Sequence, residues 1–548
     1  MSSVAARPTP LARLRARSLG PAVVAVLVVG LCGLSLFLRT RALHAGFWID
    51  EGLSVGIASF GLLEIPGILR LDGSPPLYYG LLHVWMGVFG SGEGATHGLS
   101  VVFAVLCVPV ALWAGRTLGG PRAGWMAALI AALHPFLTFF AQETRMYALL
   151  ALLALLFAAA LAHAFALGDR RFLPAVVAAG ALLAYTHNWG LFVLAGGALS
   201  VGLAAWRRAR QRRALLRDGL LAFGAIGLLY LPWVPTLLEQ AAHTGAPWSA
   251  RPGLQALLSG TFVVLGGGGA GPLLLVSAGA GVAALLGRPL PGVAPELDAD
   301  AHERRRRVVE LLLALLVTAL LLAWASSQLA PAWASRYLAA FVGPAALLAA
   351  IGLAHARGLG VAALLLLAFL WADGREGAVE AKSNVREVAS RIELRAVRPG
   401  DLVVSTHPEQ VPVLRYYLGD ALRYATSLGP HPDPRIMDWR DVLERLEAAA
   451  PRPTAARVLA ELRPGQAVVL VQPILRADRW QAPWTALVRK RVVQWERLLD
   501  RDPRLRRLET FPRFGLKAPP RGVRAILYRV REAPSSGRRA GSGRRAGN

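Results

Sequence analysis

Long apolar runs separated by short polar segments fill the first two thirds of the chain. Most of the runs are about 17–25 residues long, and a helix rises roughly 1.5 Å per residue, so runs of this length can cross a bilayer core of roughly 30 Å. Eleven spans are expected, at 21–38, 98–115, 122–141, 145–166, 172–187, 190–206, 218–236, 270–287, 308–328, 336–354 and 358–372. The pattern predicts an α-helical polytopic membrane protein.

One further apolar segment, 76–89, reaches only about 21 Å as a helix and is too short to cross. The charges of the loops support this interpretation. If 76–89 does not cross and the N-terminus is cytosolic, the arginine-rich loops all face the cytosol, as the positive-inside rule requires. These loops are 114–122, 168–171, 206–217, 288–307 and 355–358. We therefore expect 76–89 to lie along the outer surface.

The same arrangement places the loops with chemically capable side chains on the outer face. They are the first outer loop, 47–97, and segments 141–145, 186–189, 239–251 and 334–336. Within the first of them, apolar positions at helical spacing over 52–71 predict two short amphipathic helices that lie on the interface. Asp50 and Glu51 precede these helices, where Asp50 could cap a helix and Glu51 could interact with its dipole.

After residue 372 the chain becomes polar and charged. Strands are expected at 401–407, 466–473 and 524–530, and helices at 434–450 and 484–499. This alternation predicts a small α/β domain over 373–533, which the parity of the spans places outside.

The two ends of the chain have their own composition. Residues 1–20 are basic and precede the first apolar run, and we expect that run to be a retained anchor rather than a cleaved signal peptide. The tail at 534–548 is rich in glycine, serine and arginine, a composition typical of disorder.

Composition changes this picture little. The net charge of +26 could suggest a nucleic-acid partner, but the arginines cluster between apolar runs, as in cytosolic loops, so no nucleic acid is expected. Cys32 and Cys107 lie inside apolar runs, and the sequence has no disulfide framework or metal-ligand spacing.

Five short motifs occur in a fixed order along the chain. They are Asp50-Glu51, SPPLYY at 74–79, AQETRMYAL at 141–149, SRYLAAFVGP at 335–344 and KSNVREV at 382–388. Together they resemble the motifs of GT-C glycosyltransferases, in particular the protein-mannosyltransferase-like group called glycosyltransferase family 39, over residues 20 to about 420. The chain departs from that pattern at Ser74, where histidine is usual, and at Val385, where tryptophan is usual.

The resemblance implies a GT-C fold with about eleven spans in the cell (inner) membrane, surrounded by membrane lipids. It implies transfer of one sugar from a polyprenyl-phosphate donor to a glycan, lipid or protein acceptor at the outer face. The acceptor hydroxyl must lose a proton, and a carboxylate can accept it as general base. We assign that role to Asp50, and direct displacement with one base predicts inversion at the anomeric carbon.

The remaining candidates surround this base. The phosphate leaving group gains negative charge, which Arg336 and Arg145 are suited to stabilise. Glu51 could support Asp50 or a divalent cation, although no metal site is required by the sequence. The other candidates for the substrate site are Glu143, Tyr337, Tyr78 and His187. Four candidates have an alternative role: an ion pair with Arg145 for Glu143, a place at the membrane interface for Tyr78 and His187, and a membrane-surface anchor for Arg336.

Two other classes of protein fit parts of the pattern. A secondary transporter would carry ionisable groups near the membrane midplane, whereas the interiors of runs such as 308–328 contain almost none. A non-catalytic scaffold would account for the α/β domain but not for the ordered motifs of the outer loops.

Cysteine labelling tests the expected topology. In a chain whose Cys32 and Cys107 are replaced by alanine, single cysteines in 206–217 should react only from the cytosolic side. Single cysteines in 239–251, and one at position 50, should react only from the outer side. Cytosolic labelling at position 50 would remove the outer-face assignment.

Overall fold

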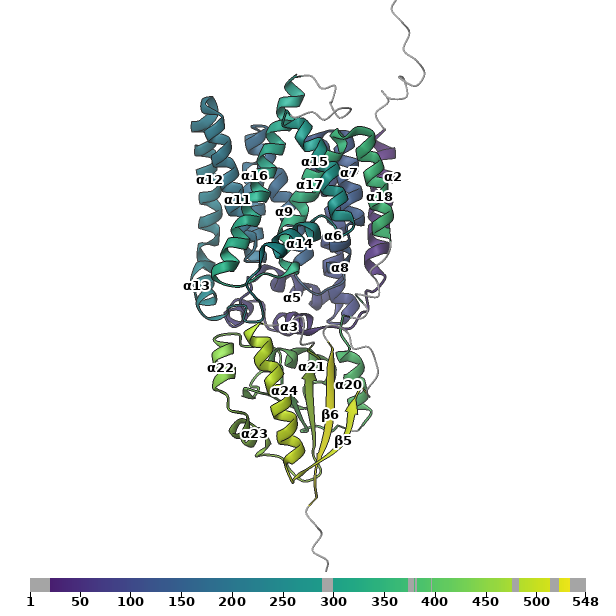
Figure 1. Ribbon diagram of the computed structural model, residues 1–548, viewed down its shortest axis with the longest axis vertical. Coiled ribbons are helices and arrows are strands. Elements are labelled where there is room, and N and C mark those ends of the chain that lie inside the picture. Colours follow the sequence, from purple (N-terminus) through teal and green to yellow (C-terminus); the bar gives the residue numbers. More distant parts are fainter. Residues whose placement is uncertain are drawn as a thin grey trace, which may run out of the picture.

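The structure is a computed structural model that describes residues 20–287, 299–372, 379, 382–395, 397–475, 482–512 and 522–532. The N-terminal segment expected at 1–20 lies outside the described residues except for Gly20, and the tail expected at 534–548 lies outside them entirely. A bundle of long helices forms one layer, and a smaller domain built on a sheet forms another (Figure 1). Helices α3 (Ile49–Ala58) and α5 (Leu77–Phe89) lie between the two.

The bundle is built from most of the chain before residue 372. Its helices are α2 (Pro21–Thr40), α6 (Glu93–Gly119), α7 (Pro121–Leu133), α8 (Pro135–Phe140), α9 (Tyr147–Leu161), α10 (Leu173–Thr186), α11 (Gly190–Arg207), α12 (Arg212–Tyr230), α13 (Val234–His243), α14 (Leu254–Val264), α15 (Ala270–Leu285), α16 (Ala299–Leu329), α17 (Ala339–His355) and α18 (Arg357–Ala372). Each expected span overlaps one of them. Within the described residues, seven helical stretches are long and apolar enough to cross a membrane, and five apolar helices are shorter.

Burial falls from the centre of the bundle outward. α9 and α17 are almost wholly buried and pack closely, because a Cβ atom at Gly343 would lie 2.6 Å from the carbonyl oxygen of Ala151. On the bundle surface, Val26 is 70% exposed and Leu220 is 77% exposed. Long helices with apolar outer faces match a lipid environment and not water. The chain is therefore a multi-pass membrane protein.

One expected span, 122–141, is divided in the structure. α7 ends at Leu133 and α8 begins at Pro135, because a proline has no N–H to donate and its ring clashes with the preceding turn. The next helix, α9, begins only at Tyr147, so residues 141–146 form a turn at the end of the bundle that faces the α/β domain.

The first outer loop contains α3, α4 (Ile65–Leu69) and α5. α3 begins after Trp48, whose backbone N–H donates to the Glu51 carboxylate at 3.1 Å. Glu51 therefore satisfies the helix start in the manner of a capping box. The alternative in which Asp50 caps this helix is wrong, because Asp50 lies within its first turn.

The α/β domain has a six-stranded mixed sheet of order β3-β2-β1-β4-β6-β5. Its strands are β1 (Leu402–Ser405), β2 (Arg423–Thr426), β3 (Gly429–Pro430), β4 (Ala467–Pro473), β5 (Leu505–Phe511) and β6 (Val523–Val530). β1 runs parallel to both β2 and β4, and the other pairs are antiparallel. α20 (Val385–Glu393) and α21 (Val411–Leu418) cover one face, and α23 (Pro451–Leu459) and α24 (Pro483–Arg501) cover the other. The helical bundle and the small α/β domain confirm the expected fold class.

The helix expected at 434–450 is shorter in the structure, where only α22 (Val442–Ala448) forms. The preceding residues make turns in which Asp433 and Asp438 accept the backbone N–H groups of Arg435 and Arg440. Aspartates bond locally to the backbone in this way and compete with helix formation.

Glycines bring α3 into close contact with the α/β domain. A Cβ atom at Gly52 would lie 2.5 Å from Cα of Val413, and one at Gly56 would lie 1.8 Å from the carbonyl oxygen of Arg435. Only glycine permits so close a backbone approach.

Backbone hydrogen bonds also join the domain to the loops of the bundle. The N–H of Trp439 donates to Leu71 at 2.8 Å, and the N–H of Asp441 donates to His243 at 2.8 Å. The domain is therefore fastened to the loops that surround α3.

Candidate active site

A cavity of about 650 Å³ lies where the bundle meets the α/β domain. Residues from several expected outer loops form one side, which we call the bundle wall: Asp50, Asp72, Arg145, His187, Arg336 and Tyr337. Residues of the α/β domain form the opposite side, which we call the domain wall: His407, Glu409, Gln410, Trp439 and Trp484. Loops that are far apart in sequence thus meet at one chamber.

The Asp50 carboxylate lies between two arginines. Its Oδ2 is 3.9 Å from Nε of Arg145 and 3.8 Å from Nε of Arg336. Both separations exceed a hydrogen-bond distance. Neither Nε has a hydrogen-bond partner among the described residues. Two guanidinium groups thus face one carboxylate and keep donors for another anion.

Arg145 is held in place from the turn at 141–146. Its Nη1 donates to the hydroxyls of Ser54 at 3.1 Å and Tyr79 at 3.3 Å, and to the backbone oxygen of Asp50 at 3.3 Å. These contacts orient the guanidinium toward α3, so the same arginine that flanks Asp50 also fixes the helix that carries it.

Arg336 is enclosed by aromatic rings. Its guanidinium lies 4.6 Å from the ring centre of Trp248, 5.3 Å from that of Tyr337 and 5.7 Å from that of Trp48. Cation–π contacts of this kind stabilise a charge without using its N–H donors. Because the side chain lines the cavity, the arrangement differs from the alternative of a membrane-surface anchor.

His187 contributes a neutral imidazole to the bundle wall. Burial, together with the nearby charges of Arg145 and Arg336, lowers its pKa to about 3. Its Nδ1 accepts the backbone N–H of Trp189 at 3.0 Å, so the proton of the neutral ring lies on Nε2. His187 is therefore a hydrogen-bond donor without charge.

Asp72 is a carboxylate of the bundle wall that the sequence did not single out. It accepts a hydrogen bond from the Tyr79 hydroxyl at 3.5 Å, at the outer limit of such a contact. Burial raises its pKa, an effect that Arg145 partly offsets. The only signal in the sequence was its position two residues before Ser74, in the loop that already held Asp50.

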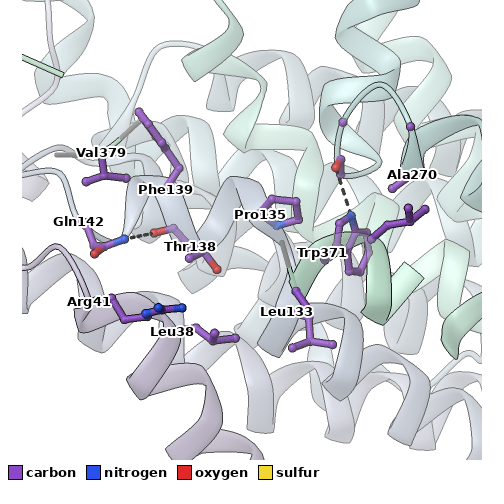
Figure 2. Close-up of a pocket in the computed structure, with 15 residues that line it drawn as sticks. Leu38, Arg41, Leu133, Pro135, Thr138, Phe139, Gln142, Ala270, Trp371 and Val379 are labelled. Atoms are coloured by element: carbon purple, nitrogen blue, oxygen red, sulfur yellow. Dashed lines mark hydrogen bonds between the residues drawn. The ribbon is translucent and has the colours of Figure 1, made fainter. Parts of the chain in front are cut away.

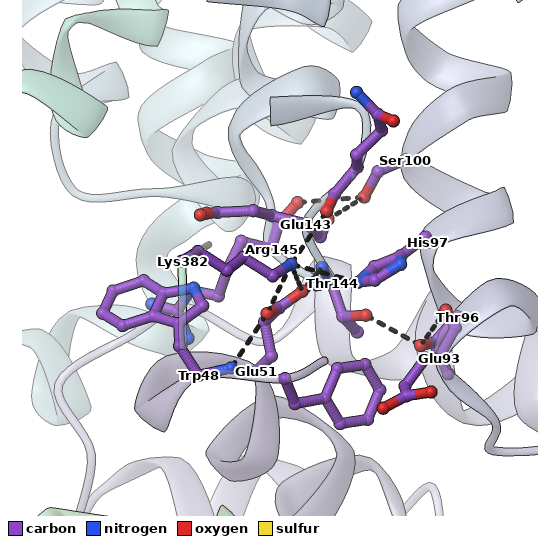
Figure 3. Close-up of polar contacts among 12 residues, drawn as sticks. Trp48, Glu51, Glu93, Thr96, His97, Ser100, Glu143, Thr144, Arg145 and Lys382 are labelled. Atoms are coloured by element: carbon purple, nitrogen blue, oxygen red, sulfur yellow. Dashed lines mark hydrogen bonds and ion pairs between the residues drawn. The ribbon is translucent and has the colours of Figure 1, made fainter. Parts of the chain in front are cut away.

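Glu51 lies behind the cavity, in a fully buried polar network (Figure 3). Its carboxylate accepts from Nε2 of His97 at 2.6 Å, the backbone N–H of Thr144 at 2.9 Å and Nζ of Lys382 at 2.8 Å. Burial alone would raise the pKa of Glu51, but Lys382 and His97 hold it well below its usual range. The carboxylate is therefore ionised and fully bonded.

The candidates from the sequence divide into two groups. Asp50, Arg145, His187, Arg336 and Tyr337 line the cavity, whereas Glu51, Glu143 and Tyr78 are buried and lie outside its lining.

The turn at 141–146 explains the burial of the second group. The backbone oxygen of Glu143 accepts the Ser100 hydroxyl at 2.7 Å, and the Tyr78 hydroxyl lies 3.4 Å from the same Ser100 oxygen. Both residues therefore pack this turn against α6.

A second, smaller pocket of about 150 Å³ lies beside α8 and α18 (Figure 2). The Trp371 indole there donates to the carbonyl of Gly266 at 3.1 Å, and Gln142 donates to Thr138 at 3.0 Å. Arg41 is the one charged side chain among the described lining residues, and none of them is a carboxylate. This pocket offers no side chain suited to accept a proton at neutral pH.

No group of three or more histidine, cysteine, aspartate or glutamate side chains is placed to hold a metal ion within the part of the chain that the structure describes. Of the three residues most suited to such a group by their chemistry, Asp50 and His187 line the cavity and Glu51 is bonded elsewhere.

The arrangement of the bundle, the helices of the first outer loop and the attached sheet domain is similar to that of solved membrane glycosyltransferases. The chain is similar to ArnT from Cupriavidus metallidurans in the apo state, with a TM-score of 0.53 and 14% identity over 83% of this chain and 96% of that one. It is also similar to the arabinofuranosyltransferase AftD from Mycobacteria, with a TM-score of 0.50 and 15% identity over 94% of this chain and 40% of AftD. No protein-family model and no curated protein sequence matches the chain.

Substitution of Glu51 tests the buried network. Glu51→Gln leaves Lys382 as an uncompensated buried charge, which costs about 3–5 kcal/mol, so we expect a clear fall in the thermal unfolding midpoint in detergent. The double variant Glu51→Gln/Lys382→Met should recover part of the loss. Glu444→Gln, on the exposed side of α22, is the control. Equal midpoints for Glu51→Gln and the control would contradict the network's role.

Proposed function

We propose that this protein is a membrane glycosyltransferase that moves one sugar from a polyprenyl-phosphate donor to an acceptor hydroxyl at the outer face of the membrane. The observation that carries the proposal is the Asp50 carboxylate between Arg145 and Arg336 in a chamber between the bundle and the domain. The resemblance to glycosyltransferase family 39 suggests the donor and the sidedness, and the GT-C fold is consistent with both.

The chemistry needs a base for the acceptor and positive charge for the leaving group. As the acceptor oxygen bonds to the anomeric carbon, its proton passes to Asp50. The bond from that carbon to the phosphate oxygen breaks, and its electron pair leaves with the lipid phosphate. The phosphate charge rises from −1 to −2, and the arginine donors stabilise this growth. A single displacement of this kind inverts the anomeric configuration.

The route for the donor's lipid tail is supported by the apolar part of the cavity lining. Leu191 and Phe192 of α11, Leu237 of α13 and Ala330 after α16 line the chamber beside the charged residues. The neighbouring Leu238 is 64% exposed on the bundle surface. An apolar part of the lining, on a helix that also carries an exposed leucine, suits a polyprenyl chain whose phosphate is bound by Arg336.

The sidedness rests on the charges at the two ends of the bundle. Arg208 donates to the carbonyl of Phe165 at 3.0 Å, and Arg305 lies 3.1 Å from His355, so the arginine-rich loops lie together. The positive-inside rule assigns such loops to the cytosol. The cavity and the α/β domain are then extracytoplasmic, and the bundle spans the cell (inner) membrane.

Glu51 and Tyr337 have supporting roles in this proposal. Glu51 fixes α3 through its buried bonds and thereby positions Asp50, which makes it a positioning residue. Tyr337 packs against His187 at a tilt, with ring centres 4.7 Å apart and ring planes at 56°, and also contacts Arg336. Both residues thus fix the positions of charged side chains in the bundle wall.

Asp50→Asn tests the base. We expect sugar transfer to fall by about 10²–10⁴-fold, the usual contribution of a general base. Binding of undecaprenyl phosphate should be unchanged or tighter, because the substitution removes a negative charge beside the phosphate site. The measurements are transfer of radiolabelled sugar from a lipid-linked donor in membranes, and lipid binding by native mass spectrometry.

Asp72→Asn is the comparison for this test, since Asp72 is the other carboxylate of the bundle wall. We expect a smaller loss of transfer than for Asp50→Asn. A larger loss for Asp72→Asn, or normal turnover by Asp50→Asn, would move the base away from Asp50.

Substitution of Arg336 tests the phosphate site. Loss of a charge-assisted hydrogen bond costs about 1.5–3 kcal/mol, so Arg336→Ala should weaken binding of undecaprenyl phosphate by roughly 10-fold or more. Arg336→Lys keeps the positive charge but loses the paired N–H donors of the guanidinium, and this variant should bind undecaprenyl phosphate with intermediate affinity. Arg122→Ala, an exposed residue of α7, is the control. Equal affinities for the alanine and lysine variants would favour an anchoring role.

A further inference from the structure

The domain wall coincides with a switch in the connections of the sheet. After β1 the chain enters α21 on one face, and after β4 it enters α24 on the other. The two strands are neighbours and parallel, with Ser405 opposite Val471. A crevice therefore opens beyond their carboxyl ends, which is where open α/β sheets bind ligands. In this protein the crevice opens into the cavity, through residues 407–410 and 473–475.

Aromatic and polar side chains line this crevice together. The Trp439 and Trp484 rings lie 5.7 Å apart and both contribute to the cavity wall. Nε2 of His407 contacts the Glu409 carboxylate and lies 3.3 Å from the Trp484 indole nitrogen. Although His407 is only 7% exposed, its Nδ1 has no hydrogen-bond partner among the described residues. A buried polar atom of this kind normally finds a partner, so Nδ1 of His407 is left to bond with a ligand in the crevice.

The two walls differ in their chemistry. The bundle wall has two arginines and two aspartates, whereas the domain wall has one histidine–glutamate pair, an amide and two indoles. The arginines suit a phosphate, and the described residues of the domain wall carry no comparable excess of positive charge. Indole faces with a few hydrogen-bonding groups instead suit a ring with apolar C–H faces and several hydroxyls. That combination is a sugar.

The two walls of the cavity can be assigned to the sugar donor and the acceptor from the geometry of the reaction. Under the proposed function, the donor's phosphate is at Arg145 and Arg336, and the acceptor must attack the anomeric carbon from the side away from that phosphate. The domain wall lies on the opposite side of the same cavity. We propose that the crevice at the carboxyl ends of β1 and β4 is the acceptor subsite, and that His407, Glu409 and Trp439 bind a sugar residue of a glycan acceptor there. The assignment of the crevice to the acceptor rests on the proposed function, whereas the binding of a sugar at the crevice does not depend on it.

Binding of simple sugars to the full-length protein tests this inference. The probes are methyl α-glycosides of D-glucose, D-mannose and D-galactose, measured by saturation-transfer-difference NMR with the protein in lipid nanodiscs. We expect at least one glycoside to bind the unaltered protein. Glu409→Gln, which is nearly isosteric, and Trp439→Leu should each weaken that binding by at least fivefold. Glu461→Gln, whose carboxylate is 81% exposed in the same domain, should leave it unchanged.

Undecaprenyl phosphate binding, measured on the same samples, separates the two proposals. Retention of this binding by Glu409→Gln and Trp439→Leu, together with loss of glycoside binding, supports the acceptor subsite. If the unaltered protein binds the lipid but none of the glycosides, the sugar assignment is overturned. Equal glycoside binding by all variants overturns the location. Failure of the unaltered protein to bind the lipid counts against the proposed function, while the glycoside result still decides the crevice.

Discussion

A single buried carboxylate, that of Glu51, connects the segments that surround the cavity. Glu51 joins α3 to α6 through His97, to the turn at 141–146 through Thr144, and to the segment after the last helix of the bundle through Lys382. Each partner comes from a different part of the chain, and a fully buried ion pair is stable only when its remaining hydrogen-bonding positions are filled. The orientation of α3, and with it the position of Asp50, depends on this network.

The orientation of α3 also determines which of its acidic side chains faces the cavity. With Glu51 turned inward, the adjacent Asp50 projects into the cavity between Arg145 and Arg336. Two neighbouring acidic residues thus have different surroundings, one in the cavity and one in a buried network, because successive side chains on a helix point in different directions. The aromatic rings around Arg336 stabilise its positive charge and leave its N–H donors unused. The site therefore remains able to bind a second anion.

The α/β domain completes the chamber. Glycines of α3 allow the domain to approach the bundle closely, and backbone hydrogen bonds from Trp439 and Asp441 fasten it to two loops. The carboxyl ends of β1 and β4 consequently face the charged residues across one cavity. The described residues of the domain thus place two indoles and a histidine–glutamate pair opposite the two arginines of the bundle wall. The fold is similar to those of ArnT and AftD, at identities of 14% and 15%.

The sequence alone determined the class of fold and singled out several residues that line the cavity. Apolar runs of membrane length identified the bundle, since the hydrophobic thickness of a bilayer sets a length that sequence displays directly. Ordered motifs located Asp50, Arg145 and Arg336 before any geometry was known. Only the tertiary structure separated Glu51 from Asp50, because His97 and Lys382 are distant in sequence and burial depends on all of them together. Likewise, Asp72, Trp248 and the domain wall entered the cavity through packing between segments hundreds of residues apart, a property that no local pattern encodes.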